Sequence, residues 1–400
     1  MRMRLLAGIG VVAVALIVGS AARAGPDVAV SNYTGAGINR PFGITAGPDG
    51  ALWFTNYGNN TIGRITVGGV VSAFTDASIV ASPLAITSGP DGALWFTSPE
   101  DNSIGRITPA GAVSKFTGEG IGDVRGITAG PDGALWFANE TDSSIGRITT
   151  AGAVTSYSGA GIAGPFAIAS GPDNALWFTS QGMQNSIGRI STSGIVSTFS
   201  DPGIRSPGEI ARGPDGALWF TNRIGNSIGR ITTAGVVSTF TGPGINLPYG
   251  ICSGPDGALW FTNRYSNSIG RITTSGVVSN YTHPSISGPW EIVAGSDGAV
   301  WFTNGDNNSI GRITTPLVKG AAEQLADLGV AVQGIGPGTS LADKVKKAQT
   351  ALNRNDVPGT CSILGAFINQ VKAQTGKTIT VEKAATLIAD AARITTVLGC

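Results

Sequence analysis

Residues 43–56 read GITAGPDGALWFTN, and the chain carries seven copies of this stretch, 41 or 42 residues apart. The copies are found most easily by their Trp-Phe pair, which begins at Trp53, Trp95, Trp136, Trp177, Trp219, Trp260 and Trp301. A Gly-Pro-Asp-Gly turn precedes each pair, with Asn174 ending the fourth copy and Ser296 replacing proline in the seventh. An Ile-Gly-Arg triplet follows each pair. Seven repeats of this length are typical of the blades of a β-propeller.

Each repeat predicts four short strands separated by turns, which in the first copy are residues 43–46, 51–55, 61–66 and 70–75. The 60 glycines and 21 prolines supply those turns. No helical period appears before residue 315, so we expect an all-β domain over residues 25–315.

The seventh repeat lacks its fourth strand, and the missing strand stands at the other end of the chain. Val30-Ser31-Asn32-Tyr33-Thr34 is identical to Val278-Ser279-Asn280-Tyr281-Thr282, a fourth strand of the sixth repeat. We therefore expect the N-terminal strand to close the ring by pairing into the last blade, which would remove an open sheet edge.

Residues 316–400 have the period of helices. Leu341, Val345, Ala348 and Leu352 fall on one face, as do Leu364, Phe367, Ile368 and Val371. The prediction is a bundle of three or four helices, with Cys361 and Cys400 paired in a disulfide. This segment resembles the small FIMAH-type helical modules of secreted bacterial proteins, which implies an interaction or stability module.

The first 24 residues fit a signal peptide, with Arg2 and Arg4 before an apolar run and Ala22-Arg23-Ala24 at the cleavage site. The apolar run is too short to span a bilayer. We expect a secreted, periplasmic or extracellular protein without stable membrane insertion after cleavage. The formal net charge of +1 and the lack of a basic patch argue against nucleic acid as a partner. Cys252 is interpreted as a small buried residue rather than a nucleophile.

Propeller topology places two rings of residues at one rim of the channel. One ring opens the first strand of each blade and consists of Phe42, Leu84, Arg125, Phe166, Gly208, Tyr249 and Trp290. The other ends the second strand and consists of Asn56, Ser98, Asn139, Ser180, Asn222, Asn263 and Asn304. Aromatic side chains beside short polar groups suit the binding of sugars or amphipathic peptides. The same aromatic side chains could instead plug the channel mouth. The candidate contacts are the four aromatic residues, Arg125 and four of the five asparagines, Asn56, Asn222, Asn263 and Asn304.

Other polar residues are interpreted as structural. The aspartate and arginine of every repeat are expected to form a turn cap and an interblade hydrogen bond, because one role copied seven times is typical of scaffolds. The single histidine, His283, has no partner in register and is expected to be solvated. Glu100, Asp101, Glu140, Asp142 and Asp306 lie in rim loops, where they suit either loop capping or a weak Ca²⁺ or Mg²⁺ site.

Residues 43–56 and the following Ile62-Gly63-Arg64-Ile65 resemble the virginiamycin B lyase (streptogramin lyase) family, over about residues 28–315. The resemblance implies a Mg²⁺-dependent lyase that linearises cyclic streptogramin B depsipeptides by elimination at their ester. In that family a Glu-Pro-His motif at the start of a first strand supplies the base, and a glutamate after Trp-Phe-x of the same blade helps to hold the metal.

This chain departs from the family motif in every blade. The Glu-Pro-His positions read Arg40-Pro41-Phe42, Ser82-Pro83-Leu84, Asp123-Val124-Arg125, Gly164-Pro165-Phe166, Ser206-Pro207-Gly208, Leu247-Pro248-Tyr249 and Gly288-Pro289-Trp290. The position of the metal glutamate is Asn or Ser in all seven. A base and a metal carboxylate are both needed for that elimination, so no catalytic residue is carried over.

Three hypotheses follow. The first is a non-catalytic binding propeller for an extracellular carbohydrate, cell-wall fragment or peptide, with no cofactor. The second is a streptogramin B lyase-like enzyme that uses His283 or a rim carboxylate in a rearranged, Mg²⁺-dependent site. The third is a structural or adaptor protein in which the helical domain carries the partner.

Overall fold

The computed structural model describes residues 28–77, 79, 82–182, 185–314, 321–335, 340–354, 356–398 and 400. The expected signal peptide lies outside these residues. The chain divides into two compact units, residues 1–316 and residues 317–400.

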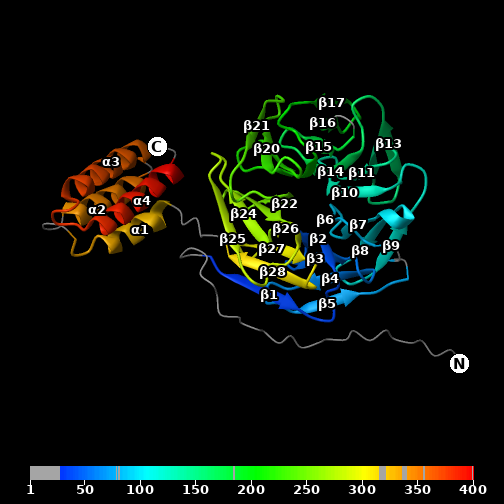
Figure 1. Cartoon of the computed structure of the whole chain (residues 1–400), viewed down its shortest axis with the longest axis horizontal. Helices are drawn as coiled ribbons and strands as arrows, with labels where there is room; N and C mark the ends of the chain where they lie inside the picture. Colours follow the sequence, from blue (N-terminus) through cyan, green and yellow to red (C-terminus); the bar gives the residue numbers. More distant parts are fainter. Residues whose placement is uncertain are drawn as a thin grey trace. The chain divides into compact units, whose positions relative to one another are not determined.

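The first unit is a propeller of seven four-stranded antiparallel sheets, as the repeats predict (Figure 1). The first blade contains β2 (Pro41–Ala46), β3 (Leu52–Asn56), β4 (Thr61–Ile65) and β5 (Val71–Phe74). The second contains β6 (Ile86–Ser88), β7 (Leu94–Ser98), β8 (Ser103–Ile107) and β9 (Val113–Phe116), with a 3-10 turn at Pro99–Asp101. The third contains β10 (Val124–Ala129), β11 (Leu135–Asn139), β12 (Ser144–Ile148) and β13 (Val154–Ser158).

The remaining blades repeat this order. The fourth contains β14 (Pro165–Ser170), β15 (Ala175–Ser180), β16 (Ser186–Ser191) and β17 (Val196–Phe199). The fifth contains β18 (Pro207–Arg212), β19 (Leu218–Asn222), β20 (Ser227–Ile231) and β21 (Val237–Phe240). The sixth contains β22 (Pro248–Ser253), β23 (Leu259–Asn263), β24 (Ser268–Ile272) and β25 (Val278–Thr282). The seventh contains β26 (Pro289–Ala294), β27 (Ala299–Asn304), β28 (Ser309–Thr314) and β1 (Val30–Thr34).

The strand β1 closes the ring, as predicted. It pairs antiparallel with β28, with Val30 opposite Ile313 and Thr34 opposite Ser309, and Figure 1 shows the two strands side by side. The ring of Tyr33 stacks on that of Trp301 at 5.3 Å, as Phe74 stacks on Trp53 at 5.1 Å in the first blade. A segment from the start of the chain therefore supplies both the backbone pairing and the aromatic packing of the last blade.

The recurring aspartate, tryptophan and arginine form one polar group inside each blade. The Trp53 indole Nε1 donates to Asp49 Oδ1 at 3.0 Å, and Arg64 Nε donates to Asp49 Oδ2 at 2.6 Å. The arginine reaches this carboxylate because Trp53 and Arg64 lie opposite each other in the β3–β4 ladder. The structural role is confirmed, but the expectation of an interblade bond from these residues is wrong, since all three belong to one blade.

A threonine of the second strand makes the interblade contact instead. Thr55 Oγ1 accepts the Gly43 N–H at 2.8 Å and donates to the Leu84 carbonyl of the next blade at 2.7 Å. The corresponding donors are Thr97, Thr179, Thr221, Thr262 and Thr303. The third blade has Ala138 at this position and therefore lacks the hydroxyl that would join it to the fourth.

The second unit is a four-helix bundle of α1 (Ala321–Ala331), α2 (Ser340–Leu352), α3 (Val357–Gln374) and α4 (Val381–Leu398). The predicted apolar faces meet in its core, where Leu341, Leu364, Phe367 and Leu387 are fully buried or nearly so. No helix in the described residues is long and apolar enough to cross a membrane.

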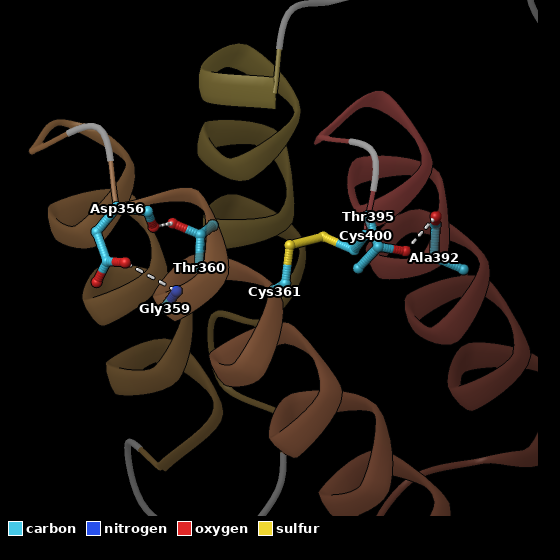
Figure 2. Close-up of a disulfide and its surroundings, with 7 residues drawn as sticks. All are labelled: Asp356, Gly359, Thr360, Cys361, Ala392, Thr395 and Cys400. Carbon is cyan, nitrogen blue, oxygen red and sulfur yellow. Dashed lines mark hydrogen bonds between the residues drawn. A yellow bond between two sulfur atoms is a disulfide. The ribbon is translucent and has the colours of Figure 1, made fainter.

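A disulfide joins Cys361 near the start of α3 to Cys400 after α4, as predicted, with their Cα atoms 5.8 Å apart. Figure 2 shows it beside the cap of α3. In that cap Asp356 Oδ1 accepts the Gly359 N–H at 2.9 Å. The bond ties the start of one helix to the end of the chain.

Candidate functional site

Six of the seven residues that open the first strands line a single cavity of about 510 Å³. They are Phe42, Leu84, Arg125, Phe166, Tyr249 and Trp290, and we call this space the mouth cavity. The repeat register therefore brings together the four aromatic candidates and Arg125 as expected. The volume lies within the range of small-molecule sites.

The backbone before each of these residues is fixed by the neighbouring blade. Leu247, two positions before Tyr249, has a φ of 45°, and its N–H donates to Asn226 Oδ1 of the preceding blade at 2.7 Å. The Tyr249 carbonyl accepts a bond from Thr221 Oγ1 at 2.8 Å. Bonds on both sides of Pro248 thus hold the strand opening, so the ring of Tyr249 is presented from a rigid backbone.

The aromatic residues contact one another across the mouth. The ring of Tyr249 lies 4.7 Å from that of Trp290 and 5.9 Å from that of Phe42, both edge-on, and 6.5 Å from that of Phe166. Tyr249 is only 9% exposed, whereas the other three rings are half-buried. The cluster thus narrows the mouth without filling it, so the structure has features of both a plug and a binding surface.

Two arginines that the sequence analysis missed lie over the aromatic rings of the mouth. The Arg264 guanidinium lies 4.2 Å from the centre of the Trp290 ring and pairs with Asp306 at 2.9 Å. The Arg223 guanidinium lies 5.2 Å from the Tyr249 ring and 5.7 Å from the Phe166 ring. Each arginine directly follows the asparagine of its second strand. That position carries arginine only in the fifth and sixth blades, and this departure from the repeat is the signal that could have found them.

The four candidate asparagines do not line this cavity. Asn56, Asn222, Asn263 and Asn304 are all buried, with an exposed fraction of 1% or less. The Asn56 amide donates to the Gly37 carbonyl at 2.9 Å and accepts the Asn39 N–H at 2.9 Å, and the other three hold the same loop in their own blades. Their expected place at the mouth is wrong, because the loop before each first strand uses both ends of the amide.

A second cavity, of about 100 Å³, shares Phe42, Leu84, Arg125 and Phe166 with the mouth cavity and contains two carboxylates. These belong to Glu209 of β18 and Glu291 of β26. Both occupy the position after the strand opening, where the other five repeats have Gly43, Ala85, Gly126, Ala167 and Gly250. Sequence reasoning missed this pair, although two glutamates in a ring of Gly and Ala are a departure that the repeat register reveals.

The surroundings of these carboxylates favour their neutral forms. Burial raises the pKa of Glu209 to about 7, against the opposing charge of Arg223. Burial, and then the charge of Glu209, raise the pKa of Glu291 well above its usual value. The Oε1 atom of Glu291 is buried without a hydrogen-bond partner. Burial and both glutamates also raise the pKa of the Tyr249 hydroxyl.

The other polar candidates have structural partners. His283 Nδ1 lies 2.7 Å from Ser285 Oγ and accepts the Ser285 N–H at 3.2 Å, so the half-buried ring holds its own turn and is not simply solvated. Arg125 pairs with Glu140 at 2.6 Å and with Asp123 at 3.1 Å. Burial raises the pKa of the Cys252 thiol, which agrees with its interpretation as a non-nucleophile.

The residues present do not fit the Mg²⁺ ion of the family's enzymes. No group of three or more His, Cys, Asp or Glu in the described parts of the chain is placed to hold a metal ion. The second-strand position that carries the metal glutamate in the family is here a buried Asn or Ser, committed in the asparagine blades to its own loop. We therefore derive no step through a metal.

Comparison with known proteins places the propeller in one family. The family model described as "Virginiamycin B lyase family" matches residues 18–158 and 121–318. A solved streptogramin B lyase is 32% identical, with a TM-score of 0.67, over 72% of this chain and 98% of the other. A catalytically inactive histidine-to-alanine variant of virginiamycin B lyase from Staphylococcus aureus, solved with quinupristin, is 34% identical, with a TM-score of 0.67, over 72% of this chain and all of the other. Comparison with curated protein sequences gave no match. The chain belongs to the virginiamycin B lyase family.

Proposed function

We propose that the propeller binds a peptide-like extracellular ligand in the mouth cavity and does not carry out the elimination reaction of the family. The observation that carries this proposal is the 510 Å³ cavity, where aromatic residues lie beside four charged ones, Arg40, Glu100, Asp123 and Arg125. An apolar pocket with a few fixed polar groups is the usual form of a site for a small organic ligand.

The arrangement of the rings favours a peptide over a flat sugar. A sugar ring stacks on an open aromatic face, but Arg264 lies over the Trp290 ring and Arg223 lies over the rings of Tyr249 and Phe166. What remains is an irregular surface of ring edges and guanidinium groups, which suits apolar side chains and backbone carbonyls. The family resemblance implies that the family's enzymes act on depsipeptides. A peptide-like ligand for this chain would belong to a similar chemical class, but the chain would bind it without cleaving it.

Two further features support an extracytoplasmic location. The first 24 residues have the pattern of a signal peptide, and the Cys361–Cys400 disulfide suits an oxidising compartment. These features favour a ligand that is met outside the cytoplasm, such as a wall-derived or secreted peptide.

The proposal is tested by screening the purified protein against arrays of peptides, cell-wall fragments and glycans. Trp290→Ala is screened in parallel, with Ile195→Ala as a control because Ile195 is 68% exposed and is not a mouth residue. We expect a peptide or wall-peptide ligand that is lost in Trp290→Ala and kept in Ile195→Ala. A glycan ligand would contradict the peptide assignment, and retained binding in Trp290→Ala would contradict the site.

A lyase with a rearranged site remains the second hypothesis, and it has its own test. The protein is incubated with quinupristin and Mg²⁺, with and without a chelator, and the intact compound is followed by mass spectrometry. The proposal predicts that quinupristin stays intact in both samples. Loss that requires Mg²⁺ would establish the lyase activity instead.

A further inference from the structure

Glu209 and Glu291 are two acidic side chains that line the small cavity adjoining the mouth cavity. Their cavity of about 100 Å³ is otherwise lined mainly by glycine, alanine, isoleucine and the mouth residues. Gly250 leaves room for one of them, since a Cβ at Gly250 would lie 2.9 Å from Glu291 Oε2. A glycine at this position therefore leaves the space that the Glu291 carboxylate occupies.

The two carboxylates differ in the charges that act on them: the charge of Arg223 acts on Glu209, whereas burial and the charge of Glu209 act on Glu291. Neither glutamate takes part in a salt bridge to a described Lys, Arg or His. Arg125 pairs with Glu140 and Asp123, and Arg223 lies over the rings of Phe166 and Tyr249. The buried Glu291 Oε1 has no hydrogen-bond partner. A buried polar atom without a partner is costly, so a ligand that donates a hydrogen bond to this atom would be favoured here.

We propose that Glu209 and Glu291 bind the primary ammonium group of a ligand whose apolar body occupies the mouth cavity. This inference rests on the proposed function, because it assigns the charged end of the same ligand. The ammonium group is a compact charge with three N–H donors, which matches two carboxylates in a small cavity. The aromatic rings above the pair would stabilise the same positive charge.

The geometry favours an amine over a divalent metal ion. Mg²⁺ and Ca²⁺ need six or more oxygen ligands, and the side chains that line the cavity supply two carboxylates and the cationic Arg125. The nearby carbonyls of Tyr249 and Trp290 already accept the hydroxyls of Thr221 and Thr262. An ammonium group needs no such coordination shell.

Binding of an ammonium group should release protons. The charged and titratable groups around the pair are Arg125 of β10, Arg223 after β19, and Tyr249 and Cys252 of β22. Burial raises the pKa of Glu209 to about 7 and the pKa of Glu291 well above its usual value, whereas the ammonium group requires the ionised forms of both. Affinity should therefore rise between pH 6 and pH 8, with proton release on binding.

The test is isothermal titration of the full chain with 2-phenylethylamine, using 2-phenylethanol as the uncharged probe of the same shape. We expect the amine to bind at least about tenfold more tightly, because hydrogen bonds to charged groups are the stronger class. Glu209→Gln and Glu291→Gln should each remove that preference, whereas Glu119→Gln, at an exposed loop residue, should keep it. The binding enthalpy of the amine should also differ between phosphate and Tris buffers, which reports the released protons.

The outcomes separate this inference from the proposed function. Equal binding of the amine and the alcohol, lost in Trp290→Ala, would overturn the ammonium site while leaving the mouth as a binding site. Binding that persists in Trp290→Ala would contradict the proposed function as well. Mg²⁺ is also titrated alone. If it binds to the wild type and to neither Gln variant, the two glutamates form a metal site, which would overturn the amine assignment.

Discussion

The Thr221 hydroxyl donates to the carbonyl of Tyr249 at 2.8 Å, so a residue of the fifth blade fixes the central residue of the mouth in the sixth. The third blade has no equivalent bond because it carries Ala138. Ala138→Thr should supply the hydroxyl and stabilise the propeller by about 1 kcal/mol. Thermal unfolding of this variant beside Thr221→Val, which should melt earlier, checks the prediction. An Ala138→Thr protein that melts earlier than the wild type would show that the third blade cannot accept the hydroxyl.

Removing the closing strand should destabilise the whole ring. Deletion of residues 28–35 takes away the β1–β28 ladder and the Tyr33–Trp301 stack, and it exposes the edge of β28. The melting temperature of the propeller should fall by several degrees, and its tendency to aggregate should rise. A truncated protein that unfolds at the same temperature, followed by circular dichroism, would contradict closure by β1.

Acid should weaken the propeller through its repeated aspartates. Burial opposes ionisation of Asp49, but the hydrogen bonds from Trp53 and Arg64 outweigh it and lower the pKa, and five of the six other blades behave alike. A carboxyl whose folded pKa is lowered contributes stability that is complete above its unfolded value of about 4 and is lost below it. Each pair should contribute about 0.5–1 kcal/mol, given its partial exposure. The urea midpoint should therefore fall between pH 5 and pH 3, and a midpoint that does not change over this range would refute the assignment.

The glutamate pair should have the opposite dependence on pH. Both folded pKa values are raised, so the contribution of the pair to stability is complete below about pH 4 and is lost as pH rises, through about 7 for Glu209. The double variant Glu209→Gln/Glu291→Gln should melt at least about 2 °C above the wild type at pH 8, with a smaller difference at pH 5. Calorimetry at both values measures this. A double variant that is destabilised at pH 8 would show that the ionised pair contributes to the fold rather than to a ligand.

Loss of the disulfide should affect the helical unit. The bond closes a loop with a sequence separation of 39 residues, so Cys361→Ser/Cys400→Ser should lose about 3–4 kcal/mol. Helical circular dichroism should show an earlier transition, while the fluorescence of the seven buried blade tryptophans should report an unchanged propeller transition. Joint movement of both transitions would mean that the two units unfold together.

The sequence predicted the fold well because each residue of the repeat has one role copied seven times. The Trp53 position, the Ile-Gly-Arg triplet and the matching segments 30–34 and 278–282 specify the blade and its closure through local pattern alone. The register also brought Phe42, Phe166, Tyr249 and Trp290 to one cavity, because residues at equivalent positions meet at the axis of a propeller.

The repeat pattern does not predict the role of a side chain whose hydrogen-bond partners lie in the neighbouring loop. Asn56 and Ser98 share a register, but whether an amide faces the mouth or its own loop depends on donors such as the Asn39 N–H. The pattern that the repeats share could not predict Glu209, Glu291, Arg223 and Arg264, because each of them departs from it. The residues that depart from the repeat are the ones that give this propeller a site of its own.

The most direct test of the account is the affinity of the ligand identified by the peptide array for three proteins: the wild type, Trp290→Ala and Ile195→Ala. The account predicts that Trp290→Ala weakens binding at least about tenfold, since an aromatic residue central to a site commonly contributes more than 1.4 kcal/mol. Ile195→Ala should bind like the wild type, and all three should melt at similar temperatures. Equal affinity for the wild type and Trp290→Ala would contradict the mouth cavity as the binding site.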